Sequence, residues 1–564
     1  MAIFSFVFAV FKRLELYYNQ QAMYLDIGGN MQKFSLSLIS VALLGIPQMG
    51  FANTTADSVN LNQAQCLALK EASIFDTQIQ YVEWNANGEV PADRMSALTG
   101  GAKKTLQAKP HCIVEGEIAA RTGADGKHYG IKFQLRLPED WNHRFLFQGG
   151  GGLDGFVGPA VGAIPVHTST ATPALMRGYA VMSMDSGHPT PTPDFGADQQ
   201  ARLDYAYQAI GKATPVAKQL IQTAYQQAAK HHYFMGCSNG GRSAMIAAQR
   251  YPLEFDGVIA ANAGFRLSRA AIAEQWDNQH LMKIAPKNAK GEKIFANALT
   301  QEDLDKVSQG VLAKCDAKDG LKDGLIHAWE KCDFDPSTLD LPKEKIDTLK
   351  AMFGGPKNSR GEAIYNGWFY DSGINQEGWR GWKLGDSQTA EPNARNIVLS
   401  KGSMTYYFMT PMQPDFDLMK FDFDKDTPRV YQTGAINDAI STDLSSFKAN
   451  GGKLIVVTGV SDPVFSAMDQ RDWFKQMQQD TKGAEEFSRF FAIPGLNHCG
   501  GGNGLDDVDP LTALEQWHDN QKAPESLLAK GKTYPNKQMP ICAYPKVATY
   551  IGGDENKPES FECK

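Results

Sequence analysis

The sequence has little of the material that binds polyanions or crosses membranes. Only 21% of its 564 residues are charged, and a net charge of −7 gives no reason to expect nucleic acid or an anionic membrane as a partner. After residue 52, no apolar run reaches the roughly 20 residues that span a bilayer. Internal repeats and low-complexity tracts are absent as well. What remains is the composition of a globular chain, long enough for two or more structural units.

Cysteine is also scarce, and its number points to the compartment. Eight cysteines, an even count, suit a disulfide framework in an exported chain. Residues 1–52 are predicted to be the targeting segment: Lys33 is its positive end, residues 34–46 its apolar core, and Gly50-Phe51-Ala52 a cleavage motif. We expect translation to start at Met31. No cysteine follows the apolar core to carry a lipid anchor, so the protein is expected to be secreted or periplasmic.

The most informative stretch is residues 232–242, which predicts a short strand, a tight turn and the start of a helix. Gly236-x-Ser238-x-Gly240 matches the nucleophile elbow, in which a serine projects above the edge of a parallel sheet. Glycines flank the serine because the turn is too sharp for side chains. The pattern also occurs by chance, but a predicted helix to Tyr251 and a buried strand at 257–263 favour the elbow.

Strands and helices alternate on both sides of this elbow. Before residue 129 the signal is weak, a helix around 61–71 and then a polar segment. Strands are predicted at 129–137, 144–148, 179–184, 454–458 and 488–493, with a helix at 213–230. Such alternation is typical of a mostly parallel sheet covered by helices on both faces.

Between residues 265 and 446 this alternation disappears. Helical pieces, glycine turns and aromatic residues replace it. We therefore predict an α/β-hydrolase fold in which residues 53–264 and 447–564 form the catalytic domain, and residues 265–446 form a large inserted lid domain.

Ser238 needs a base and a carboxylate that orients the base. In this fold they follow the serine in the order acid, then histidine. Asp462 lies in the turn at the carboxyl end of the strand predicted at 454–458, whereas Asp469 and Asp472 fall in the helix predicted beyond it. Of the 11 histidines, only His498 lies in a glycine-rich loop after a strand. We predict Ser238, Asp462 and His498 as the catalytic residues.

Two cysteines strengthen this assignment. Cys237 precedes Ser238, and Cys499 follows His498. If Ser238 and His498 meet in space, the two sulfur atoms come near bonding distance. A disulfide there would hold together a pair whose catalytic value depends on accurate placement.

Four glycines, Gly149 to Gly152, follow the strand predicted at 144–148. A glycine run at a strand end lets backbone N–H groups approach a ligand closely. In α/β-hydrolases, the corresponding loop supplies half of the oxyanion hole. A flexible turn is the alternative, but the position upstream of the elbow favours the oxyanion role.

Together these motifs resemble the tannase and feruloyl esterase family, which also contains mono(2-hydroxyethyl) terephthalate hydrolases. The matching residues lie between about Cys112 and Cys563 and are Gln148-Gly149-Gly150-Gly151-Gly152, Asp185-Ser186-Gly187-His188, Gly236-Cys237-Ser238-Asn239-Gly240-Gly241-Arg242, Gly459-x-x-Asp462, His498-Cys499 and Pro540-Ile541-Cys542-Ala543-Tyr544-Pro545.

The resemblance implies an α/β-hydrolase core with a lid and hydrolysis of esters of aromatic carboxylic acids. It also implies the triad above, the Cys237–Cys499 disulfide, and oxyanion donors at the backbone N–H of Asn239 and of either Gly150 or Gly151.

A tight acidic loop at residues 315–326 contains three carboxylates and two glycine turns. By itself it favours an acidic turn over a calcium site, and it is not an EF-hand because the spacing differs and no glutamate closes it. The resemblance implies a structural Ca²⁺ held by Asp316, Asp319 and Asp323 side chains and the carbonyls of Leu321 and Leu325. Cys315–Cys332 would then close the loop, which leaves Cys66–Cys112 and Cys542–Cys563 as the other disulfides.

Aromatic residues of the predicted lid are candidates for stacking on a substrate, although lid aromatics more often form the lid's own core. The candidates are Trp382, Tyr406, Tyr407 and Phe408. Arg395 could meet a substrate carboxylate or phenol oxygen, or be an exposed structural arginine. The sequence does not separate galloyl, hydroxycinnamoyl and terephthalate monoesters.

We expect a small-molecule aromatic ester as substrate, and a hydroxycinnamoyl ester of the feruloyl or chlorogenate type, because no dedicated carboxylate site is evident. Two other classes stay open. A serine peptidase could use the same triad, and peptide substrates would distinguish it. A non-enzymatic binding protein would need a broken triad, but every member is present.

Overall fold

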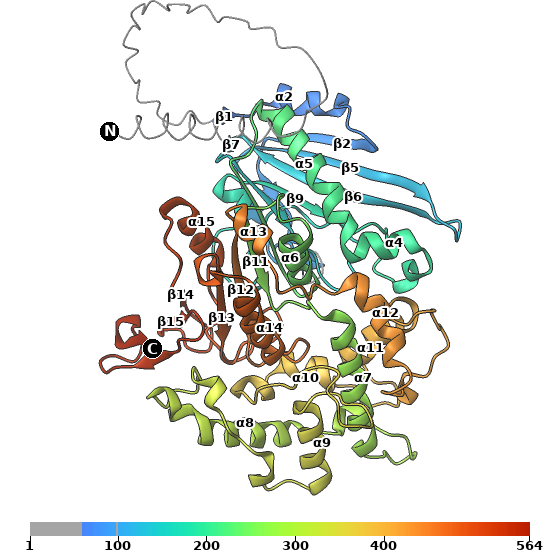
Figure 1. Cartoon of the computed structure of the whole chain (residues 1–564), viewed down its shortest axis with the longest axis vertical. Helices are drawn as coiled ribbons and strands as arrows, with labels where there is room; N and C mark the ends of the chain where they lie inside the picture. Colours follow the sequence, from blue (N-terminus) through green and yellow to red (C-terminus); the bar gives the residue numbers. More distant parts are fainter. Residues whose placement is uncertain (1–58, 97–99) are drawn as a thin grey trace, which may run out of the picture. The chain divides into compact units, whose positions relative to one another are not determined.

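A mixed sheet of nine strands organises the part of the chain that the computed structural model describes, residues 59–96 and 100–564. The predicted targeting segment lies outside these residues. The sheet order is β13-β12-β11-β10-β8-β9-β6-β5-β2 (Figure 1). Its strands are β2 (Thr77–Asn85), β5 (His111–Thr122), β6 (His128–Pro138), β8 (Arg144–Gln148), β9 (Ala180–Met184), β10 (His231–Cys237), β11 (Gly257–Ala261), β12 (Lys453–Gly459) and β13 (Ser488–Ile493).

The sheet has a parallel part and an antiparallel part. From β13 to β9 all neighbouring strands are parallel. Beyond β9, the strands β6, β5 and β2 pair antiparallel. The sequence did not predict β2 and β5. β2 is an edge strand whose side chains are exposed or half-buried, so its sequence lacks the apolar pattern of a buried strand.

Helices cover both faces of the parallel part. Phe145 and Phe147 of β8 pack in one hydrophobic cluster with α5 (Ala209–Tyr225), α6 (Asn239–Arg250) and α14 (Ala467–Asp480). Leu146, between them, packs in a second cluster with α15 (Pro510–Asn520). Because successive strand residues point to opposite faces, the middle of a strand buried on both sides is apolar on each face, as Phe145, Leu146 and Phe147 of β8 are.

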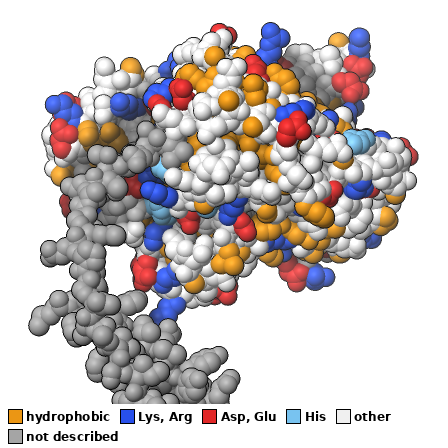
Figure 2. Space-filling model, turned by 90° about the horizontal axis from the view of Figure 1, so that it is seen from above, with side chains coloured by type: hydrophobic (Ala, Val, Ile, Leu, Met, Phe, Trp, Pro, Cys, Tyr) orange, Lys and Arg blue, Asp and Glu red, His pale blue; other side chains and the backbone are white. Residues whose placement is uncertain are grey.

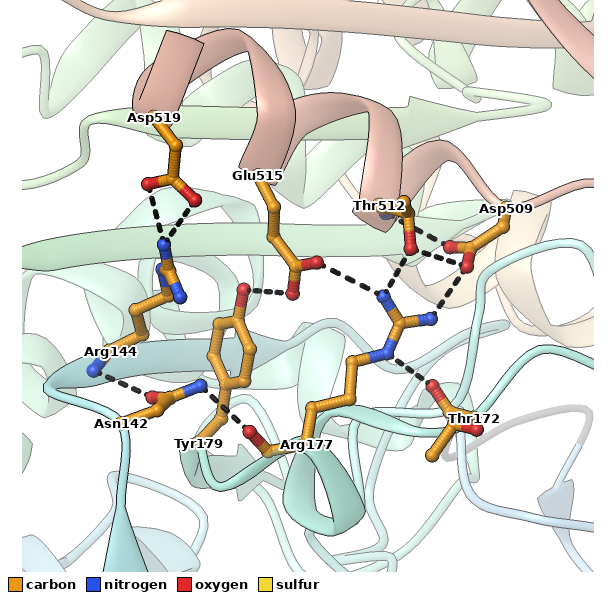
Figure 3. A network of polar contacts seen from close by, with 9 residues as sticks. All are labelled: Asn142, Arg144, Thr172, Arg177, Tyr179, Asp509, Thr512, Glu515 and Asp519. Carbon is orange, nitrogen blue, oxygen red and sulfur yellow. Dashed lines mark hydrogen bonds and ion pairs between the residues drawn. The ribbon is translucent and has the colours of Figure 1, made fainter. Parts of the chain in front are cut away.

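Ion pairs attach α15 to the sheet (Figure 3). The guanidinium of Arg177 lies 2.8 Å from Asp509, and the Tyr179 hydroxyl donates to Glu515 at 2.6 Å. At the other end of the helix, Arg144 lies 2.7 Å from Asp519. These contacts fix the position of the helix that follows the His498 loop.

Between β11 and β12 the chain forms helices. Residues 265–446 are all described by the structure, and none of them belongs to a strand. The helices are α7 (Leu267–Ile284), α8 (Gln301–Cys315), α9 (Lys343–Phe353), α10 (Glu377–Lys383), α11 (Arg395–Gly402), α12 (Thr427–Asn437) and α13 (Ser445–Ala449). Figure 1 shows α8, α9 and α10 below the sheet, with α12 to the right of its lower part. Two hydrophobic clusters are built largely from this region. The predicted lid boundaries stay a prediction.

Smaller elements complete the described chain. They are β1 (Val59–Asn60), α2 (Gln63–Ala68), β3 (Glu89–Val90), β4 (Leu106–Gln107), β7 (Asp140–Trp141), α4 (Gln199–Leu203), β14 (Ser526–Ala529), β15 (Met539–Cys542), β16 (Ala548–Tyr550) and β17 (Phe561–Cys563).

The structure contains four disulfides, with the pairs expected above: Cys66–Cys112, Cys237–Cys499, Cys315–Cys332 and Cys542–Cys563. On the face seen in Figure 2, basic and acidic side chains are scattered among each other. In residues 59–96 and 100–564, no helix combines the length and the apolar character that crossing a bilayer requires.

Candidate active site

Ser238 lies at the sharp turn between β10 and α6, in a backbone conformation that side chains rarely adopt (φ 62°, ψ −124°). The two flanking glycines are required by the close approach of the backbone. A Cβ on Gly236 would lie 2.6 Å from the carbonyl of Gly240, and a Cβ on Gly240 would lie 2.3 Å from the oxygen of Gly150. The turn therefore has the local geometry of the predicted elbow, including its strain.

The structure brings the three predicted catalytic residues together from three different segments. His498 Nε2 lies 2.9 Å from Ser238 Oγ. His498 Nδ1 lies 3.0 Å and 3.2 Å from the two carboxylate oxygens of Asp462. Each spacing is a hydrogen-bonding distance. The serine, the imidazole and the carboxylate thus form a continuous chain in which a proton can pass from Ser238 to His498.

Asp462 is 1% exposed and is held by its own turn after β12. One oxygen accepts the N–H groups of Val464 and Phe465 at 2.8 and 3.2 Å. The other accepts the side-chain amide of Asn262 at 2.7 Å. Asn262 follows β11 in a left-handed conformation (φ 38°). The sequence analysis did not single it out, because nothing local indicates that its amide reaches a residue two hundred positions away.

The two rival carboxylates lie in α14 and have other partners. Asp469 is buried and pairs with Arg266 at 3.0 Å. Asp472 accepts a hydrogen bond from Asn366 at 2.8 Å. Within the described residues, neither contacts His498.

The Cys237–Cys499 disulfide adjoins both Ser238 and His498, and its Cα atoms are 6.0 Å apart. Cys499, like Ser238, has a left-handed backbone (φ 58°). The covalent bond therefore joins two strained turns whose neighbouring side chains must meet.

The glycine loop approaches the elbow from the other side. Gly149 donates its N–H to Met235 of β10 at 2.8 Å. Within the described part of the chain, the N–H groups of Gly150 and Gly151 make no hydrogen bond. Asn239 is the first residue of α6, so its N–H has no partner inside the helix. These free donors suit an oxyanion, and the choice between Gly150 and Gly151 stays open.

A buried polar network behind the elbow was not predicted. The Asn239 side chain donates to Asp154 at 2.7 Å and accepts from Arg242 at 2.7 Å. Asp154 also accepts from the Ser186 hydroxyl. Burial raises the pKa of Asp154 to about 6. Arg242 is fully buried and donates to three backbone carbonyls, which locks the start of α6 in place.

A cavity of about 540 Å³, counted with the solvent at its mouth, opens on Ser238. It is lined by Gly152, Leu153, Tyr205, Ser238, Asn239, Leu267, Ala271, Glu274, Trp382, Leu399, Ser403, Phe408, Val464 and Phe465. Most of these side chains are apolar, so the cavity favours an apolar or aromatic group next to the serine.

Of the predicted substrate-binding residues, some line the cavity and others do not. Trp382 lines the cavity, and its ring centroid lies 5.1 Å from that of His498. Tyr407 does not line it, because its ring is buried in a hydrophobic cluster and its hydroxyl donates to Asn437 at 3.0 Å. Tyr406 is also absent from the lining. Arg395 is exposed, with its guanidinium 5.5 Å from the centroid of the Trp382 ring.

The acidic loop holds carboxylates of the type that calcium prefers. Asp316 accepts the N–H of Gly324, and Asp319 accepts those of Leu321 and His327. Burial raises the pKa of Asp319 to about 7. Lys537 lies 2.7 Å from Asp323.

No group of three or more His, Cys, Asp or Glu side chains in the described residues is arranged to hold a metal ion. The oxygen donors of the loop suit calcium in kind, and the calcium site stays a prediction.

Most of the chain is similar to known proteins. The family described as tannase and feruloyl esterase matches residues 112–564. Mono(2-hydroxyethyl) terephthalate hydrolase of Piscinibacter sakaiensis is 35% identical over 511 residues, which cover 80% of this chain and 84% of that protein. A probable feruloyl esterase of Arthroderma benhamiae is 27% identical over 468 residues, covering 77% and 82%. The crystal structure of feruloyl esterase B from Aspergillus oryzae has a similar fold, with a TM-score of 0.74 at 22% identity, covering 89% of this chain and 100% of that one.

Proposed function

This chain belongs to the tannase and feruloyl esterase family and is a carboxylic ester hydrolase, and we propose that it acts as a serine esterase on esters of aromatic acids. The observation that carries the proposal is the hydrogen-bonded chain Ser238–His498–Asp462, whose serine lines a largely apolar cavity.

The reaction takes two steps through an acyl-enzyme. His498 removes the proton of Ser238 as the serine oxygen attacks the ester carbonyl, and Asp462 stabilises the resulting imidazolium. The negative oxygen of the tetrahedral intermediate is held by the N–H of Asn239 and of Gly150 or Gly151. Loss of one such donor costs on the order of 10²–10³ in rate. The alcohol leaves with the proton from His498, and a water molecule then releases the acid by the same route.

Our preferred substrate is a hydroxycinnamoyl ester, of the feruloyl or chlorogenate type. The apolar cavity with Trp382 and Phe408 in its wall supports an aromatic acyl group. A mono(2-hydroxyethyl) terephthalate ester is the second candidate, which the Piscinibacter sakaiensis relative favours. A galloyl ester is the third.

Two further parts of the proposal concern the setting of the enzyme. Four disulfides and the sequence of residues 1–52 support a secreted or periplasmic protein. A structural Ca²⁺ would be held by Asp316, Asp319 and Asp323 with the carbonyls of Leu321 and Leu325. Bound there, it would neutralise the carboxylates and stiffen the loop.

The test is a hydrolysis panel on the purified protein with methyl ferulate, chlorogenic acid, methyl gallate and mono(2-hydroxyethyl) terephthalate. Ser238→Ala should lower kcat/KM by about 10⁴-fold or more and leave the thermal unfolding curve in place. Ser243→Ala, a buried serine farther along α6, is the matched control and should retain activity. Unchanged turnover in Ser238→Ala would refute the serine mechanism.

A further inference from the structure

One carboxyl side chain faces the largely apolar cavity, and the mechanism does not use it. Glu274 lines the cavity together with Leu267 and Ala271 of the same helix, α7. These residues are spaced i, i+4 and i+7, so they share one helix face. Leu267 lies three residues after Gly264, whose N–H donates to the carbonyl of Ser238. Glu274 is two turns farther on, about 10 Å along the helix axis.

The carboxyl group of Glu274 has no partner of its own. Within the described residues it makes no hydrogen bond and no ion pair, although it is partly open to the cavity. The nearby ammonium of Lys383 is already paired with Asp277, and both of these side chains are buried. Burial, with a smaller contribution from the charge of Asp277, raises the pKa of Glu274 to about 8.

A carboxyl without a partner inside a site costs free energy unless a bound molecule supplies the hydrogen bond. The cavity wall around it is apolar, so the complementary ligand is an aromatic group with a polar, uncharged atom at its far end. A phenolic hydroxyl meets this requirement because it can both donate to and accept from a carboxyl group.

We propose that Glu274 is a specificity-determining residue that binds the phenolic hydroxyl of a hydroxylated aromatic acyl group whose ester carbonyl lies at Ser238. The inference deepens the proposed function and rests on it. It also predicts discrimination against a second carboxylate on the acyl group, because the largely apolar cavity would desolvate that charge and the nearby Lys383 is already paired with Asp277.

The position of Glu274 also predicts which length of acyl group fits best between it and Ser238. Glu274 lies two helical turns from the residue nearest the elbow, so a vinyl spacer between ring and ester helps the hydroxyl to reach it. The structure therefore favours 4-hydroxycinnamoyl over 4-hydroxybenzoyl esters.

The test compares substrates that differ in one group: methyl 4-hydroxycinnamate against methyl cinnamate, and monomethyl terephthalate as the anionic probe. In wild type, the hydroxylated ester should have the higher kcat/KM. Glu274→Leu should lower the ratio of kcat/KM for the hydroxylated and unsubstituted esters about tenfold, the effect of one hydrogen bond. Glu274→Gln, which keeps an uncharged polar group in place of the protonated carboxyl, should retain most of that ratio, and monomethyl terephthalate should stay the poorest substrate of wild type and of both variants. Glu302→Gln, an exposed glutamate of α8, is the matched control and should leave the ratio unchanged.

An unchanged ratio for the hydroxylated and unsubstituted esters in Glu274→Leu would overturn the inference. If Glu274→Leu does not fold, the same comparison in Glu274→Met, an unbranched apolar side chain of similar length, decides it. If wild type hydrolyses none of these esters, the proposed function fails instead. The inference is then decided by binding of the free acids to wild type. Tighter binding of 4-hydroxycinnamate than cinnamate, lost in Glu274→Leu, supports it, and equal binding overturns it.

Discussion

The Cys237–Cys499 disulfide should control both stability and catalysis. It closes a segment of 262 residues, the longest loop closed by any disulfide in the described residues. By the chain-entropy relation, such a crosslink stabilises the folded state by about 5.6 kcal/mol. The Cys542–Cys563 bond, with a separation of 21 residues, gives about 3 kcal/mol by the same relation. Replacing both members of each pair with alanine should therefore cost more stability at the first site.

Catalysis should separate the two variants more sharply. Cys237 and Cys499 adjoin Ser238 and His498, and both turns have left-handed residues that relax without a constraint. A displacement of about 1 Å between serine and imidazole costs on the order of 10² in rate. We expect kcat/KM for methyl ferulate to fall by 10–100-fold in Cys237→Ala/Cys499→Ala, by the same estimate. Cys542→Ala/Cys563→Ala should keep near-wild-type activity.

The assay needs a temperature at which both variants are folded. Urea unfolding followed by circular dichroism gives the free energy of unfolding, and kcat/KM is measured well below each transition. A folded Cys237→Ala/Cys499→Ala variant with kcat/KM within about twofold of wild type would show that packing alone places His498 against Ser238. The positioning role of the disulfide would then be wrong.

Two further predictions concern buried carboxyl groups. Glu274 has a pKa of about 8 in the folded protein against an ordinary glutamate pKa of 4.5, so the folded state favours the protonated carboxyl, and stability is lost as the pH rises from 4.5 to 8. Across this window the wild type should lose about 1.4 kcal/mol per pH unit relative to Glu274→Gln, measured by urea unfolding at pH 5.5 and 8; parallel pH dependences would contradict the assignment. For the acidic loop, removing divalent ions with a chelator should lower Tm and added Ca²⁺ should restore it by mass action. Asp319→Asn should abolish the calcium response, and a wild-type Tm that ignores both treatments would reject the site.

Much of the site could be predicted from the sequence, because its parts are local signals. Glycines around Ser238 are required by a turn that no other residue fits, and Asp462 and His498 each follow a buried apolar strand. In a parallel sheet the carboxyl ends of such strands lie at one edge, so chain order is enough to bring the three residues together. Because Cys237 and Cys499 adjoin Ser238 and His498, the meeting of those two residues also predicts the disulfide.

Only the tertiary structure decided which lid residues face the cavity. Tyr407 and Phe408 are neighbours of similar character, yet Phe408 lines the cavity while Tyr407 packs in the core and binds Asn437. They lie in a π-helical turn, Ser403–Phe408, whose rotation depends on packing against other segments. For the same reason the sequence did not indicate Glu274 or Asn262. A side chain's direction is fixed by contacts with distant residues, and these have no local pattern in the sequence.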